Sequence, residues 1–173
     1  MKPEDCSDVH MHDFEIRADY AGLFELERLF WGNIMKHLNI KFPFVTFPLN
    51  TDGIDPSGPN HTYRRIKITN YDDAIVPKPS HEGHVFNCTE NILAENIQVF
   101  LGVGMSIGSV PPSVGHNCIK DVVFRNVNFS YPFKAIYVKS NPGDVGDGII
   151  KNITYENIHI DTPIWWSVYI GPQ

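Results

Sequence analysis

The stretch Asn91-Ile-Leu-Ala-Glu-Asn-Ile-Gln-Val99 decides the fold, because related stretches recur three more times along the chain. In each copy the seventh and ninth positions are apolar and a polar residue separates them, which is the alternation of a β-strand. All copies begin with Asn or Asp, whose side chains can continue a backbone hydrogen-bond ladder between stacked coils. The other three copies, which place the four starts 31, 30 and 31 residues apart, are Asn60-His-Thr-Tyr-Arg-Arg-Ile-Lys-Ile68, Asp121-Val-Val-Phe-Arg-Asn-Val-Asn-Phe129 and Asn152-Ile-Thr-Tyr-Glu-Asn-Ile-His-Ile160.

A repeat of this length, built of short strands, indicates a solenoid whose coils stack and bury a shared core. Arrays of helical hairpins have repeats of similar length. The alternation of Val and Ile with polar residues and the 13 prolines argue against helices. The sequence therefore predicts an all-β fold, a right-handed parallel β-helix.

The repeat divides the chain into two parts. Residues 49–173 are expected to form a partial parallel β-helix domain, whereas residues 1–48 lack the repeat and are expected to be an irregular or partly helical N-terminal segment. Apolar residues at helical spacing predict a short amphipathic helix over about 22–38 that caps the solenoid; these residues are Leu23, Leu26, Phe30, Ile34 and Leu38.

The C-terminal stretch Trp165–Gln173 still has the pattern of a coil, so a chain truncated at this end is expected. For the adjacent Trp165 and Trp166, we expect one ring in the core and the other at the exposed end of the coil. A platform for a sugar ring is the alternative.

Composition limits the class of protein. A chain of 173 residues is expected to be one domain, and a hydrophobic content of 42% supports a folded core. The net charge of −6 argues against a nucleic-acid partner, and no apolar run is long enough to span a membrane. A monomer is expected.

Two features bear on the compartment. Four N-glycosylation sequons favour an extracellular glycoprotein, although Met1–Cys6 lacks the apolar region of a secretory leader. The three cysteines allow at most one internal bridge. Cys88 and Cys118 lie one coil apart, so a disulfide and two buried free thiols are both open. The sequons begin at Asn60, Asn87, Asn128 and Asn152.

Two acidic motifs point to chemistry: Asn50-Thr51-Asp52-Gly53 and, twenty residues later, Asp72-Asp73. Each motif alone is ordinary turn chemistry, since Asp and Gly are common turn residues. Together they place three carboxylates about one coil apart, which suits a site that splits glycosidic bonds. In such a site one acid protonates the departing oxygen while another carboxylate activates water.

Counting along the repeat predicts the neighbours of the acidic motifs. Asp72-Asp73 and Val103-Gly104 occupy matching positions in successive repeats, so they should lie about 4.8 Å apart along the stack. Lys139 falls in the next coil. Consecutive side chains of a flat strand point to opposite faces, so Asp72 and Asp73 share a cleft only if the backbone bends there.

Four blocks, taken in order, resemble the signature motifs of glycoside hydrolase family 28, the polygalacturonases and related pectinases. The resemblance implies a right-handed β-helix, an inverting mechanism without metal or other cofactor, and polygalacturonate-like pectic polysaccharides as substrates. The blocks are Asn50-Thr51-Asp52-Gly53, Asp72-Asp73, Gly102-Val-Gly-Met-Ser-Ile-Gly-Ser109 and Tyr137-Val-Lys139.

The resemblance also implies roles for single residues. By position, Asp72 is the general acid, and Asp52 and Asp73 activate the water. Lys139 binds a substrate carboxylate as a point charge with three donors; the alternative for Lys139 is a solvated cation on a strand face. Asn50 belongs to the first block and is expected at the substrate.

Three further residues are candidates for substrate binding. Lys78, in the Lys78-Pro79 pair that follows the two aspartates, is more like the exo-acting members of the family. Tyr137 either stacks against a sugar ring or lines the groove. His116 either overhangs the cleft or is an exposed loop histidine.

The chain departs from the family pattern at two positions. Polygalacturonases carry His where this chain has Val103, and Arg where it has Tyr137. Arg binds a carboxylate as a bidentate fork, which Tyr cannot imitate. Three explanations are open: a rhamnogalacturonan hydrolase, whose relatives also lack that His and Arg, a weakened hydrolase, or a non-catalytic carbohydrate-binding β-helix.

Overall fold

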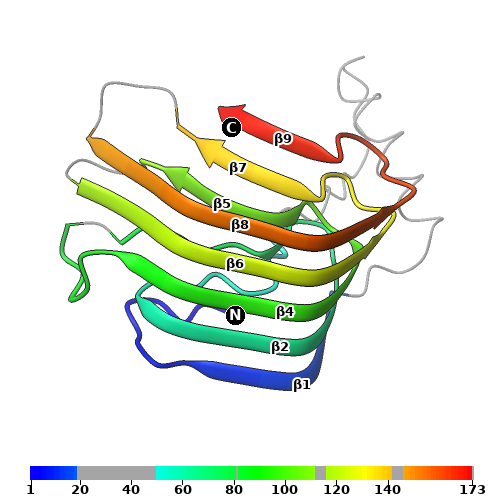
Figure 1. Cartoon of the computed structure of the whole chain (residues 1–173), viewed down its shortest axis with the longest axis horizontal. Coiled ribbons are helices and arrows are strands. Elements are labelled where there is room, and N and C mark those ends of the chain that lie inside the picture. Colours follow the sequence, from blue (N-terminus) through cyan, green and yellow to red (C-terminus); the bar gives the residue numbers. More distant parts are fainter. Residues whose placement is uncertain (19–49, 81, 112–115, 142–145, 173) are drawn as a thin grey trace, which may run out of the picture.

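The computed structural model describes residues 1–18, 50–80, 82–111, 116–141 and 146–172. These residues form β-strands joined by turns and bends, and the strands stack as successive coils (Figure 1). The strands are β1 (His10–Arg17), β2 (Pro59–Asn70), β3 (Asp73–Ile75), β4 (Thr89–Leu101), β5 (Gly104–Val110), β6 (His116–Ser130), β7 (Ile136–Ser140), β8 (Asp147–Asp161) and β9 (Val168–Pro172).

The strands form two parallel sheets. The long sheet has the order β1-β2-β4-β6-β8, and the short sheet has the order β3-β5-β7-β9. From β2 onward each coil contributes one strand to each sheet, so neighbours in a sheet come from successive coils (Figure 1). The prediction of a right-handed parallel β-helix is confirmed, in keeping with the right-handed crossovers of parallel strands.

The register of the long sheet follows the repeat in the sequence. Ile66 pairs with Ile97, Ile97 with Val127, and Val127 with Ile158, so equivalent positions lie on top of one another. Ile66, Ile97 and Val127 are buried in the core between the sheets. The steps of 31, 30 and 31 residues predicted from the sequence are therefore the steps of this register.

Asparagine side chains continue the hydrogen bonding beyond the strands. Asn126 donates from Nδ2 to Oδ1 of Asn96 at 3.2 Å, and Asn157 donates in the same way to Asn126 at 3.1 Å. A second row includes Asn91, which donates to Asn60 at 3.2 Å. All five have positive φ, which Asn adopts more readily than most residues. Asparagine thus turns the chain and links the coils.

The N-terminal segment differs in part from the prediction. Residues 10–17, inside the segment expected to be irregular or partly helical, form β1 and pair in parallel with β2. In this coil Asp8 and Asp13 occupy the positions that continue the side-chain rows. Asp8 accepts a hydrogen bond from Asn60, and Asp13 accepts one from Arg65. Each lies 52 residues before its partner, and this longer step hid the coil from a search for repeats of about 30 residues. The predicted helix over 22–38 lies outside the described residues.

The two Cys residues one coil apart form a disulfide, Cys88–Cys118, with a Cα–Cα distance of 4.7 Å. This decides between the two alternatives that the sequence left open. Cys6 is a free thiol.

The expectation for Trp165 and Trp166 is wrong in one respect. Both rings are exposed, at 59% and 46% of their surface, and neither lies in the core. They stack on each other in the turn before β9. None of the described segments forms a helix of the length and apolar character needed to cross a bilayer.

Candidate active site

The first acidic motif is held against β3 by the backbone. Gly53 donates its N–H to the carbonyl of Asp73 at 2.9 Å, and Ile54 donates to Ala74 at 3.0 Å. A Cβ at Gly53 would lie 2.2 Å from the Ala74 carbonyl oxygen, so only glycine permits this close approach. The contact places Asp52 beside the Asp72-Asp73 pair.

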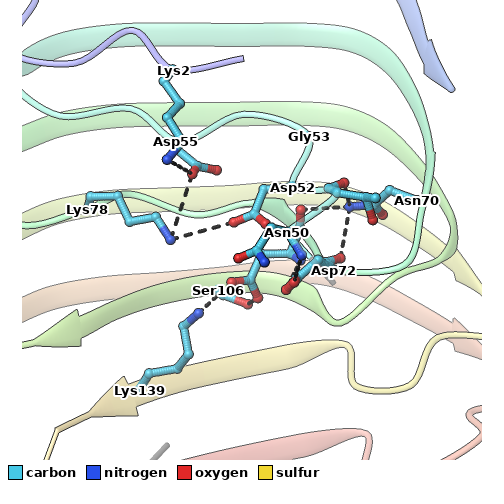
Figure 2. A network of polar contacts seen from close by, with 12 residues as sticks. Lys2, Asn50, Asp52, Gly53, Asp55, Asn70, Asp72, Lys78, Ser106 and Lys139 are labelled. Atoms are coloured by element: carbon cyan, nitrogen blue, oxygen red, sulfur yellow. Dashed lines mark hydrogen bonds and ion pairs between the residues drawn. The ribbon is translucent and has the colours of Figure 1, made fainter. Parts of the chain in front are cut away.

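The three predicted acids converge. One carboxylate oxygen from each of Asp52, Asp72 and Asp73 lies within 4.8 Å of the others, and all three line a cavity of about 370 Å³. Figure 2 labels Asp52 and Asp72 at this site. The backbone bends at residues 71–72 before β3 begins. This bend is the condition under which consecutive aspartates were expected to share a cleft.

Asn70 fixes the bend. Its side chain is fully buried, and Nδ2 lies within hydrogen-bonding distance of the carbonyls of Thr51, Asp72 and Asp73 at 3.0, 2.8 and 2.8 Å. Gly102, with φ of +76°, leaves room for it, because a Cβ there would meet Asn70 Oδ1 at 2.7 Å. Asn70 thus joins the acidic motifs. The sequence analysis missed it, and its position directly before Tyr-Asp-Asp is the signal that could have found it.

The surroundings of the Asp72 carboxyl group raise its pKa. Burial raises its pKa, and the negative charges of Asp52 and Asp73 raise it further. The backbone N–H groups of Asn50 and Asp73, at 2.7 and 2.9 Å, oppose this by stabilising the anion. A half-buried carboxylic acid with a raised pKa suits a general acid.

Asp73 is paired with a buried cation. Its Oδ2 accepts a hydrogen bond from the Lys139 ammonium and its Oδ1 accepts one from the Ser106 hydroxyl. Lys139 is 5% exposed. The structure therefore brings Lys139 into the site but holds its charge on Asp73, so carboxylate binding by Lys139 stays a prediction. Ser106 was not predicted.

A second ion-pair group lies on the other side of the cavity. Lys78 Nζ lies 3.6 Å from Asp52 Oδ2 and 3.9 Å from Asp55 Oδ2 (Figure 2). Asp55 is almost completely buried, and this burial raises its pKa to about 6 against the attraction of Lys78. Lys78 thus lies beside the acids, and its role in substrate binding stays a prediction. Asp55 was missed although it closely follows the first motif.

The other predicted residues vary in their placement. Asn50 lines the cavity. Tyr137 lies in β7 and is only 6% exposed, which leaves little of its ring to stack on a sugar. Val103 donates its N–H to the Asp72 carbonyl at 2.8 Å, and Asp73 pairs with Gly104, as predicted. His116 begins β6, and its side chain lies outside the described part of the chain.

The arrangement can support acid–base chemistry on a glycosidic bond, because three carboxyl groups, one of them with a raised pKa, face one cavity. In inverting enzymes the two carboxyl groups are about 6.5–9.5 Å apart, which admits a water between them. The nearest oxygens of the three acids are closer than this, so inversion stays a prediction from the resemblance. Carboxylate oxygens are also ligands that hard divalent cations prefer.

Comparison with known proteins gives consistent results. The family model described as glycosyl hydrolases family 28 matches residues 1–170. A probable rhamnogalacturonase C of Aspergillus niger is 37% identical over 106 residues, which are 61% of this chain and 20% of that protein. This chain therefore spans a minor part of that relative.

One solved structure is similar in fold. It is the endo-xylogalacturonan hydrolase of Aspergillus tubingensis, with a TM-score of 0.59 and 24% sequence identity. The match covers 70% of this chain and 31% of that structure.

Proposed function

Since the chain belongs to glycosyl hydrolases family 28, we propose that it hydrolyses a glycosidic bond in a galacturonic-acid-containing pectic polysaccharide. The observation that carries the proposal is the convergence of Asp52, Asp72 and Asp73 on one cavity. A module that only binds sugar has no need for this acid–base set.

The surroundings of the acids suggest a division of roles. Asp72, with its raised pKa, protonates the departing oxygen. Asp52 takes the proton from the attacking water. Asp73 was expected to share this task, but Lys139 and Ser106 already bond both of its oxygens. We assign to Asp73 the fixed negative charge that helps to keep Asp72 protonated.

Rhamnogalacturonan is the second candidate substrate. The relative named as a probable rhamnogalacturonase favours it, as do Val103 and Tyr137 at the positions where polygalacturonases carry His and Arg. Both candidate polymers contain galacturonic acid. Exo-action, which Lys78 suggests, belongs to the same proposal, and the size of the first products tests it.

An extracellular location fits the Cys88–Cys118 disulfide, because disulfides persist mainly in oxidising compartments. Of the four sequon asparagines, Asn60 and Asn152 take part in side-chain ladders. Asn87 and Asn128 are exposed and form no ladder bond within the described part of the chain. We propose secretion and glycosylation on this basis, with Asn87 and Asn128 as the acceptors.

The test is release of reducing sugar from polygalacturonate and from rhamnogalacturonan by the unmodified chain and by Asp72→Asn. We expect the substitution to lower the rate by about 10²–10⁴-fold, because it removes the proton donor. Asp147→Asn, which changes an exposed acid at the start of β8, serves as the matched control and should retain full activity. NMR of the first product gives the anomeric configuration and so tests inversion.

Equal release by Asp72→Asn and the unmodified protein would remove Asp72 from the mechanism. If the folded protein binds either polymer but releases nothing from both, the hydrolase proposal fails and a non-catalytic sugar-binding β-helix takes its place.

A further inference from the structure

Lys134 lies in the turn between β6 and β7 with its ammonium among aromatic rings. Its Nζ is 3.6 Å from the centroid of Tyr137, 4.8 Å from that of Tyr169 and 5.4 Å from that of Trp165. These three rings, which we call the aromatic cage, come from two successive coils. Cation–π attraction over several rings holds the ammonium in place.

Lys134 differs from the lysines of the acidic cavity in its ion pairing. Lys139 pairs with Asp73, and Lys78 pairs with Asp52 and Asp55, whereas Lys134 forms no ion pair with any residue that the structure describes. Burial is the main influence on its pKa and lowers it, so the ammonium has already lost part of its water. A partly desolvated cation without a carboxylate partner favours an anionic ligand.

Lys134 also lies close to the acids. Its ammonium and that of Lys139 face the same ring, since Lys139 Nζ is 5.2 Å from the centroid of Tyr137. The charges of Asp73 and Asp72 act on the Lys134 ammonium and favour its charged form. Lys139 lines the acidic cavity and also faces a ring of the aromatic cage, so we infer that a polymer chain in the cavity continues over the cage.

A stack of three aromatic rings adjoins the ammonium. Trp165 and Trp166 stack with centroids 4.4 Å apart at 20°, and Trp166 stacks on Tyr169 at 5.1 Å and 22°. Both tryptophan rings are exposed. The apolar face of a pyranose ring packs well against such a surface, because aromatic rings offer a large, rigid apolar area.

We propose that Lys134 and the exposed Trp165–Trp166 stack form a binding subsite for a uronic-acid residue of the polysaccharide. In this subsite the Lys134 ammonium binds the sugar carboxylate and an indole ring packs against the pyranose. The subsite rests on the proposed function. It supplies, from a different position, a cation for the carboxylate that, within the described residues, is not paired with an aspartate as Lys139 is.

Calorimetric titration of galacturonate oligomers into the Asp72→Asn protein tests this subsite without turnover. Adding Lys134→Met should weaken binding by about 10- to 100-fold, since it removes a charge-assisted contact, whereas Lys134→Arg should retain most of the affinity. Lys67→Met, on the exposed face of β2, is the matched control and should bind unchanged. Methyl-esterified oligomers should not distinguish Lys134→Met from Lys67→Met.

A second variant, Trp165→Ala, should weaken binding of both the charged and the esterified oligomers. Circular dichroism melting should show the same fold for all variants. Equal affinities of Lys134→Met and Lys67→Met for the charged oligomers would overturn the subsite, while hydrolysis by the unmodified protein would leave the proposed function intact. A folded protein that neither binds nor cleaves any pectic polymer would overturn both.

Discussion

The long and the short sheet are built from the same coils but differ in regularity. Strands β4, β6 and β8 of the long sheet have 13, 15 and 15 residues, and they pair without a register shift. Strands of the short sheet have only 3 to 7 residues, and the register shifts between Asp73 and Ile75 and again between Ile107 and Val110. The regular repeat is therefore found in the long sheet, whereas the irregular short sheet holds residues of the candidate active site.

The two sheets also differ in what they bury. The inward face of the long sheet buries aliphatic and aromatic side chains such as Ile97 and Phe124. The short sheet buries the Asp73–Lys139 pair. The buried Asp55 follows Ile54, whose backbone bonds Ala74 of β3 in this sheet. Buried charges cost free energy unless they are paired and hydrogen-bonded. Both sheets contribute apolar residues to the core, but among the described strands only those of the short sheet bury an ion pair.

The largest expected effect comes from breaking the buried ion pair of the short sheet. Lys139→Met leaves Asp73 buried and unpaired, which should lower the free energy of unfolding by about 3–5 kcal/mol. Urea denaturation measures this loss in the free energy of unfolding. Lys120→Met removes a partly exposed ion pair with Glu90 in the long sheet and should cost less than about 1 kcal/mol.

The double variant Lys139→Met/Asp73→Asn sharpens this test, because it removes both charges and should recover part of the lost stability. Equal losses for Lys139→Met and Lys120→Met would contradict the difference in burial between the two sheets.

A cavity in the core of the long sheet should have the next largest effect. Ile97 is fully buried, so Ile97→Ala should lower the free energy of unfolding by about 2–4 kcal/mol. Val168→Ala, at the exposed position where β9 begins in the short sheet, should change it by less than about 0.5 kcal/mol. Thermal and urea unfolding measure both, and a similar loss at both positions would show that the core is not where the structure places it.

The smallest expected effect depends on pH. Asp55 has a pKa of about 6 in the folded protein against an ordinary value of 3.8. Between these values the unfolded chain has released the proton while the folded protein keeps it, so stability falls as pH rises through this range and then stays low. Asp55→Asn lacks this loss. Because solvent in the open cavity screens the charge, the variant should gain only about 1–2 kcal/mol relative to the unmodified protein across that range.

Urea denaturation at a series of pH values measures this gain. At pH values below the ordinary pKa, Asp55 is protonated in both states, so the two proteins should then show the same pH dependence. A difference in stability that stays constant as pH rises through both pKa values would contradict the raised pKa of Asp55.

Much of the fold could be predicted from the sequence, because the same pattern of Asn or Asp and apolar residues recurs in successive coils. The spacing of the Asn and Asp positions predicted the coils at Asn60, Asn91, Asp121 and Asn152 and their register, since equivalent positions must pair for a shared core to form. The coil that contains β1 escaped prediction, because 52 residues rather than about 30 separate its ladder positions from those of β2. Motif spacing predicted that the three acids of the cavity would meet.

Other features were decided only by the tertiary structure. Asn70 reaches carbonyls of two segments, Lys139 is buried against Asp73, and Lys134 lies among rings from two coils. Such contacts depend on which side chain points into the space between coils, and the pattern of apolar and polar residues does not encode it. Periodicity determined the scaffold because the same short-range rule applies in every coil. The site is irregular, so its charges were placed by packing in three dimensions.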